Sequence, residues 1–147
     1  MRTVLRILAA VLTVLSLSTA AFAQGGQVVK IMLTIEGRDY PAILYDNPAA
    51  KDLLSRLPLT VSLNRGGRDY CGDIPTIKYD QAQVQKGYRN GQLAYWISGQ
   101  DFVIFIEKEE SGASVDGVVV LGELTGDYQT LFNLGRSITV AIVRAEK

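Results

Sequence analysis

Residues 91–106 read GQLAYWISGQDFVIFI, and this stretch decides the fold. It contains the chain's only tryptophan, a polar turn and a long apolar run rich in β-branched and aromatic residues, which predicts two strands joined by a tight corner. Because successive side chains of a strand point to opposite faces, Tyr95 and Trp96 face different sides of the sheet. Trp96 therefore either packs in a core or lines a groove, and both interpretations stay open at this point.

Residues 1–23 have the pattern of a cleaved signal peptide. Arg2 and Arg6 form a positive start, residues 7–17 form a short apolar core, and an Ala-Phe-Ala site at 21–23 supplies the small residues that a signal peptidase reads. We therefore expect an exported protein, periplasmic or extracellular, with no stable membrane insertion once the leader is removed. The alternative is an uncleaved membrane anchor, which the short apolar core disfavours.

Residues 24–147 have the length of a single domain with one hydrophobic core. The whole chain carries 15 basic and 15 acidic side chains, and removal of the two leader arginines leaves 13 basic against 15 acidic, a net charge of about −2. The basic residues form no stripe along the sequence. We therefore expect no nucleic-acid partner.

The residue types that are missing exclude several kinds of catalytic site. The sequence has no histidine and a single cysteine, Cys71, so a Ser/His/Asp triad, a Cys/His pair and the usual zinc sites are impossible. It also lacks a calcium-hand loop and a glycine-rich phosphate loop followed by Lys-Ser/Thr. We therefore expect no metal and no cofactor. We interpret Cys71 as structural or incidental, because Asp73 nearby would raise its pKa and lower its reactivity.

The start of the domain predicts a hairpin followed by a helix. Apolar residues alternate over 28–36 and 40–44 around a Glu-Gly-Arg-Asp turn, which is typical of two paired strands. Pro41 has no amide hydrogen, so the second strand lies at an edge or is interrupted there. The Asn-Pro pair at 47–48 suits the cap and first position of a helix, which Pro58 ends.

The remaining chain is β-rich around one irregular region. A strand at 59–63 precedes residues 64–91, which are rich in Gly, Asp, Arg and Tyr and which we interpret as a long loop. This loop is either functional or a solvated excursion with a short β segment at 76–79. A polar loop, a strand, a short helix and a last strand are predicted at 107–113, 115–123, 126–134 and 137–143. The fold class is mainly β: a closed or nearly closed β-barrel with two short capping helices.

Three segments resemble the cyclophilins and, more closely, the small bacterial cyclophilin-like proteins. They are a helix entry, a glycine-led strand with its turn and apolar partner, and an Asp-Gly turn before an apolar strand: Asp46-Asn47-Pro48-Ala49-Ala50, residues 91–99 with 102–104, and Asp116-Gly117 with 119–124. A helix and a closing β-strand come next in both, and with them the matches cover nearly all of residues 24–147. The resemblance implies one cyclophilin-like domain built as a closed β-barrel.

A prolyl isomerase of the cyclophilin family presents an arginine, a glutamine, a phenylalanine, a tryptophan and a histidine around an apolar groove. At the matching positions this chain has Val103 for the phenylalanine, Ser114 for the tryptophan and the pair 118–119, two valines, for the histidine. The resemblance leaves Arg65 or Arg68 to supply the arginine. Either one would then be the catalytic residue if the protein is an isomerase.

The side chains that remain predict a ligand-binding groove. We expect it to be lined by Arg68, Tyr70, Trp96, Asp101 and Val103. An aromatic ring beside a cation suits a small carboxylate-bearing molecule or a peptide segment. The sequence therefore favours an exported, non-catalytic binding module for a small molecule or a peptide. The alternative is a divergent peptidyl-prolyl isomerase or a folding helper for exported proteins.

Overall fold

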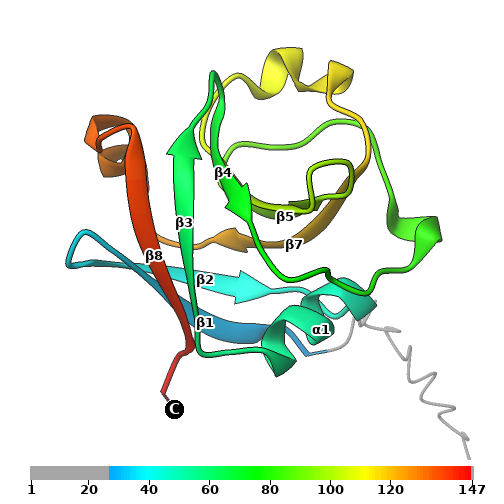
Figure 1. The fold of residues 1–147 in the computed structure, drawn as a ribbon, viewed down its shortest axis with the longest axis horizontal. Helices are drawn as coiled ribbons and strands as arrows, with labels where there is room; N and C mark the ends of the chain where they lie inside the picture. The colour runs from blue at the N-terminus through cyan, green and yellow to red at the C-terminus, as the bar shows by residue number, and fades with distance from the viewer. Residues whose placement is uncertain (1–26, 147) are drawn as a thin grey trace, which may run out of the picture.

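The chain folds as a closed barrel of eight antiparallel strands (Figure 1). The computed structural model describes residues 27–146, and the leader expected at residues 1–23 lies outside them. Around the barrel the strands follow the order β1-β2-β7-β5-β6-β4-β3-β8. Their bounds are β1 Val29–Ile35, β2 Arg38–Leu44, β3 Leu59–Arg65, β4 Asp69–Asp73, β5 Gln92–Trp96, β6 Asp101–Phe105, β7 Val118–Leu124 and β8 Ser137–Arg144. The mainly β fold class and the closed barrel are confirmed.

The first two strands form the predicted hairpin. Its turn places Glu36 and Gly37 at φ values of 51° and 75°, so the glycine takes a left-handed conformation that it adopts without steric cost. Pro41 lies inside β2, and the ladder between β2 and β7 begins only at Ala42. Because proline cannot donate to a ladder, the predicted interruption at Pro41 falls where pairing with β7 stops.

The helix α1 (Pro48–Ser55) begins as its sequence predicts. The Asn47 side chain accepts a hydrogen bond from the Ala50 N–H at 2.8 Å, and its amide donates to the Val120 carbonyl of β7 at 3.0 Å. The helix stops at Ser55, earlier than the predicted end at Pro58, since proline disfavours helical geometry in the residue before it. Asn47 therefore caps the helix and fixes it to the barrel wall.

Residues 64–91 contain a strand that the sequence interpretation missed. β3 runs on to Arg65 and β4 follows after a tight turn, so the prediction of one long loop is wrong in its first part. The β segment expected at 76–79 is also wrong, because those residues have no strand structure. An excursion at 74–91 remains, which passes α1, contains the 3-10 helix η1 (Gln81–Gln83) and returns to β5 (Figure 1).

Strands β5, β6 and β7 are buried on both faces, which accounts for their nearly continuous apolar sequences. Tyr95 and Phe102 point into the barrel core, whereas Val103 and Phe105 point outward into a second, smaller apolar cluster. Tyr88 of the excursion covers that outer cluster. Its ring stacks on Phe105 with 3.8 Å between centroids and 8° between planes, so the excursion is packed against the barrel wall.

Two further 3-10 helices lie at the rim of the barrel. η2 (Glu109–Ser114) occupies the predicted polar loop, and η3 (Gln129–Asn133) lies where a second short helix was expected. The N-cap residue of η3 is Tyr128, so the prediction that Asp127 caps this helix is wrong by one residue. The Asp127 side chain accepts a hydrogen bond from the Gln129 N–H at 2.8 Å in the turn that leads into η3. Leu131 of η3 is fully buried and closes the core beside β8.

Closure of the barrel requires glycine at position 122. A Cβ atom at Gly122 would collide with the main-chain carbonyl of Ile43 in β2, which cannot move without breaking the ladder. We expect Gly122→Ala to lower the free energy of unfolding by about 3 kcal/mol or more, as measured by urea denaturation. Gly67→Ala, at a position with open space around it, is the control and should change stability by less than about 1 kcal/mol. Equal stability of both variants would contradict this account of closure.

Candidate functional site

Trp96 and Asp101 come together at the corner between β5 and β6. They are register partners, and both side chains lie against Gly99, where a Cβ atom would stand 2.8 Å from Asp101 Oδ2 and 2.8 Å from Trp96 Cε3. Trp96 keeps 38% of its surface exposed and donates a hydrogen bond from Nε1 to the Asp116 carbonyl at 3.2 Å. The interpretation of Trp96 as a core residue is therefore wrong, because its ring lies on the outside of the barrel.

A hollow of about 600 Å³ opens beside Asp101 on the outer side of β3, β4 and β6. Polar side chains of three strands surround it. Its lining residues are Thr60, Val61, Ser62, Asn64, Cys71, Gly72, Asp73 and Asp101. We call this site the outer hollow. Hydroxyl and amide groups of β3 meet a thiol and carboxyls of β4 and β6, so the outer hollow suits a ligand that donates hydrogen bonds.

The carboxyl groups at the outer hollow repel one another. Partial burial, a hydrogen bond with Asp73 and the charges of Asp73 and Asp69 all raise the pKa of Asp101. Burial raises the pKa of Asp69 as well. Among residues 27–146, no lysine or arginine forms a salt bridge with Asp73 or Asp101. Asp73 and Asp101 therefore have no salt-bridge partner within that range, and a cationic group suits them. The carboxylate-bearing molecule expected from the sequence does not.

Cys71 is held as a neutral thiol at the floor of the outer hollow. Burial is the largest cause that raises its pKa to about 11, and the charges of Asp69 and Asp101 add to the effect. The sequence correctly placed an acidic neighbour near Cys71, but the charges responsible are those of Asp69 and Asp101, not that of Asp73. A thiol with this pKa is a poor nucleophile at neutral pH.

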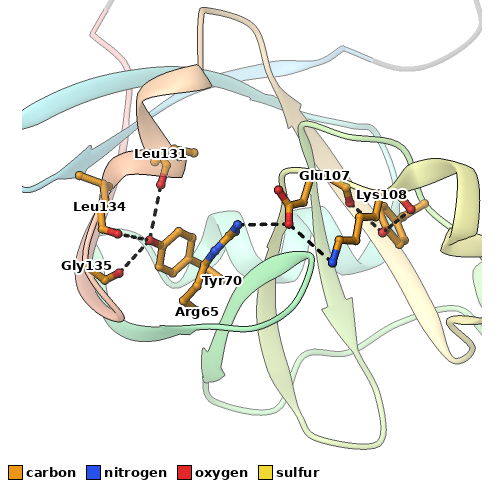
Figure 2. Close-up of polar contacts among 8 residues, drawn as sticks. Arg65, Tyr70, Glu107, Lys108, Leu131, Leu134 and Gly135 are labelled. Carbon is orange, nitrogen blue, oxygen red and sulfur yellow. Dashed lines mark hydrogen bonds and ion pairs between the residues drawn. The ribbon is translucent and has the colours of Figure 1, made fainter.

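Tyr70 lies inside the barrel and not over an outer groove. It is fully buried, and its hydroxyl donates to the carbonyls of Gly135 at 2.8 Å and Leu134 at 3.2 Å, beyond η3 (Figure 2). Since it belongs to a regular strand, its neighbour Cys71 points outward instead. The structure therefore does not bring Tyr70 and Trp96 together as the sequence predicted.

Of the two arginines considered as catalytic candidates, Arg65 forms side-chain contacts within the fold. Arg65 pairs with Glu107 at 3.3 Å (Figure 2). Its guanidinium lies over the rings of Tyr70 and Phe132, 5.3 and 5.9 Å from the centroids. The Arg68 side chain forms no salt bridge among residues 27–146, and its buried Nη1 has no hydrogen-bond partner there. Arg68 is half-buried in the turn between β3 and β4, where its carbonyl accepts from the Ile106 N–H at 3.1 Å. Neither arginine lines the outer hollow.

Val103 also lies away from any open groove. It is buried in the outer apolar cluster beneath Tyr88, on the same row as Cys71 and Ala94. Of the five predicted ligand-binding residues, Trp96 and Asp101 are thus the two that the structure brings together on an open surface. Arg68, Tyr70 and Val103 lie elsewhere.

Sequence reasoning missed the β3 side of the outer hollow. Thr60, Ser62 and Asn64 alternate with apolar residues, which predicts a strand with one polar face, but nothing in that pattern says which strands are its neighbours. Asp73 was missed as a lining residue because β4 itself was not recognised. The neighbour of β3 becomes known only from the pairing of Asn64 with Cys71.

No metal centre or membrane helix is found in the part of the chain that the structure describes. Within residues 27–146, no group of three or more histidine, cysteine or acidic side chains is arranged to hold a metal ion. No helix in the same range has the length and apolar character needed to cross a membrane.

The chain belongs to the Cyclophilin-like family, whose model matches residues 33–143. Its fold is similar to a hypothetical protein from Archaeoglobus fulgidus whose structure was determined in solution, with a TM-score of 0.62. The two chains are 18% identical, and the match covers 84% of this chain and 99% of the other. No curated protein matches this chain. The resemblance predicted from the sequence is confirmed at the level of family and fold.

The pKa of Cys71 predicts slow alkylation. At pH 8 a thiol with a pKa of about 11 has about a hundredfold less thiolate than one at the reference value of 9.0. We expect iodoacetamide to modify the folded protein at least about thirtyfold more slowly than the urea-unfolded chain, with the folded rate rising steeply up to pH 10. Asp101→Asn is expected to accelerate the reaction and Glu110→Gln to leave it unchanged. Equal rates in the folded and unfolded chains would contradict the environment described for Cys71.

The raised pKa of Asp101 predicts that its charge destabilises the fold. Because the folded pKa lies above the unfolded value, the ionised carboxylate costs stability at neutral pH, and this cost disappears below the unfolded pKa, near pH 4. Asp101→Asn is therefore expected to raise the free energy of unfolding at pH 7 by up to about 1 kcal/mol, with no gain at about pH 3. Urea denaturation at both pH values tests this, with Glu110→Gln as control. A loss of stability at pH 7 would refute it.

Proposed function

We propose that the protein is a non-catalytic binding module whose outer hollow takes the cationic group of a small molecule or of a peptide side chain. The observation that carries the proposal is the pair of carboxyls, Asp73 and Asp101, which face one open hollow without a salt bridge from residues 27–146. An amine or a guanidinium in the hollow would form charge-assisted hydrogen bonds with them. Trp96 is not among the residues that line the hollow, but its exposed ring packs beside Asp101 against Gly99, so a ligand that extends past Asp101 would meet it.

The hydroxyl and amide groups of β3 offer further hydrogen bonds that would orient a bound cation. Ser62 and Asn64 are exposed and line the same hollow. The Asn64 carbonyl oxygen already accepts a hydrogen bond from Ser137 Oγ at 2.8 Å. The Ser62 hydroxyl would therefore accept a hydrogen bond from a guanidinium donor that remains once two of the five donors are paired with a carboxylate. This arrangement supports recognition of an arginine-like group in preference to a simple ammonium ion.

The contacts of Arg65 support binding without catalysis by that residue. A prolyl isomerase of the family needs an arginine that faces the bound peptide, and here Arg65 is paired with Glu107 and stacked on Tyr70. Releasing it would break an ion pair and a ring contact inside the fold. The alternative function as a divergent isomerase or folding helper therefore has less support than the binding module.

We also propose that the protein acts after export, in the periplasm or outside the cell. The support is the pattern of residues 1–23, with its two arginines, short apolar core and Ala-Phe-Ala site. In that compartment the ligand would be a free small molecule or an exposed peptide segment, and not a nucleic acid.

Trp96 is the only tryptophan and lies beside Asp101 at Gly99, so its fluorescence is expected to respond when a ligand binds at Asp101. Titration with N-acetyl-arginine amide is expected to give a saturable change in its fluorescence. Asp101→Asn is expected to weaken binding about tenfold, since it removes a charge-assisted hydrogen bond worth about 1.5–3 kcal/mol. Glu110→Gln removes an exposed carboxylate elsewhere and serves as the matched control. High salt is expected to weaken binding to the original chain.

Two results would contradict the proposed function. One is the absence of any saturable change, or an Asp101→Asn variant that binds as tightly as the original chain. The other comes from exchange spectroscopy on an Ala-Pro peptide, where we expect the rate of cis–trans exchange to be unchanged by the protein. Accelerated exchange that is lost in Arg65→Ala or Arg68→Ala would establish the isomerase instead.

A further inference from the structure

Two places in the chain have the residue pair that most readily closes a succinimide ring, the first step in a spontaneous change of asparagine or aspartate. They are Asn90-Gly91 before β5 and Asp116-Gly117 before β7. Glycine favours ring closure because it has no side chain to hinder the attack of its nitrogen on the preceding side chain. Both glycines have positive φ, 88° and 70°. The two pairs differ in what holds the glycine nitrogen.

The fold holds Asn90-Gly91 away from ring closure. The Gly91 N–H donates to the Phe105 carbonyl of β6 at 2.7 Å, and the Gly91 carbonyl accepts from the Leu124 N–H of β7 at 2.8 Å. The Asn90 N–H donates to the Glu109 carboxylate at 2.8 Å, and the side-chain oxygen of Asn90 is buried. The Gly91 nitrogen therefore cannot turn toward the Asn90 side chain without leaving a buried carbonyl unpaired.

Asp116-Gly117 has the opposite arrangement. Asp116 lies outside the strands, and its side chain is 70% exposed. Its Oδ1 accepts a hydrogen bond from the Gly117 N–H at 2.8 Å, and within residues 27–146 this N–H forms no main-chain hydrogen bond. The Gly117 nitrogen is thereby held beside Cγ of Asp116, the atom that it attacks. Such proximity raises the rate of an intramolecular step.

We propose that Asp116 is a modification site, at which the folded protein converts aspartate to isoaspartate through a succinimide, independently of the proposed function. The Gly117 nitrogen forms a bond to Cγ of Asp116, and the amide proton leaves with a carboxyl hydroxyl as water. Water then opens the ring. Cleavage of the new bond to Cγ restores aspartate, whereas cleavage of the original peptide bond leaves the chain connected through Cγ. Water is lost and regained, so the reaction needs no other reactant.

The modified link would disturb the corner that holds Trp96. The Asp116 carbonyl accepts from Trp96 Nε1 at 3.2 Å, and the Gly117 carbonyl accepts from the Ile97 N–H at 3.0 Å. Isoaspartate turns the first carbonyl into a free carboxylate and adds one methylene group to the main chain before the second. Since hydrogen bonds weaken steeply when their geometry changes, we expect the indole of Trp96 to lose its present surroundings.

The test is to store the purified folded protein at neutral pH and to map isoaspartate by proteolysis, mass spectrometry and isoaspartyl methyltransferase labelling. We expect conversion of Asp116 to be at least about tenfold faster than all reactions of Asn90, because the Gly117 nitrogen is free to attack. In guanidinium chloride we expect the order to reverse, since an amide is attacked more readily than an ionised carboxylate once the fold no longer holds Gly91.

Two variants serve as controls for the position of the reaction. Asp116→Glu lengthens the side chain, so the five-membered ring cannot form, and no isoaspartate is expected in this segment. Asp127→Glu changes an exposed aspartate that is followed by Tyr128, and it is expected to leave the conversion of Asp116 unchanged. Products at Asn90 that precede those at Asp116 in the folded protein would overturn the proposal, as would equal isoaspartate in the original chain and Asp116→Glu.

The emission of Trp96, the only tryptophan, gives a second readout. It is expected to shift as Asp116 converts and to stay constant in stored Asp116→Glu. Constant emission of fully converted protein would overturn the account of the corner. Because no ligand is added, failure here is distinguishable from failure of arginine-amide binding at Asp101.

Discussion

The barrel closes where β2 meets β7, and the rest of the structure depends on this short ladder. Three residue pairs join the strands, between 42–44 and 122–124. The Asn47 side chain extends the contact by donating a hydrogen bond to the Val120 carbonyl of β7. The residue that caps α1 therefore also holds the chain after β2 against β7. Without a bare Cα at Gly122, the main chains could not approach closely enough to pair. The first hairpin would then be attached on one side only, through β8, and the core would lie open to water.

In each strand of the closed barrel, side chains point alternately into the core and out to the surface. In β4, Tyr70 points inward and ties the strand to the segment after η3, while Cys71 and Asp73 point outward to the outer hollow. Because the interior is filled by side chains, an eight-stranded barrel of this size leaves no room for a ligand inside. The candidate binding surface, the outer hollow, therefore lies on the outer wall of the barrel, on β3, β4 and β6.

The sequence predicted the strands whose neighbours are local and missed what depends on distant pairing. Periodicity located the hairpin, the capped helix and the apolar pair at 91–106, because each is encoded within about twenty residues. It could not place Tyr70 inside the barrel, since β4 is short and its partner β6 follows far along the chain. For the same reason it assigned a cation and aromatic rings to one groove, whereas pairing across the sheet brings carboxyls together beside Trp96.

The raised pKa of Cys71 bears on the export proposed above, because exported proteins meet an oxidising environment. A lone thiol on a secreted protein normally invites mixed disulfides and covalent dimers, because the thiolate attacks other disulfides. Here the neighbouring acids Asp69 and Asp101 suppress that thiolate, and partial burial restricts access to it. Asp101, which gives the outer hollow part of its negative charge, thus also keeps the Cys71 thiol protonated and less reactive. In the exported setting proposed above, these two acids would slow the reaction of the unpaired Cys71 with other disulfides.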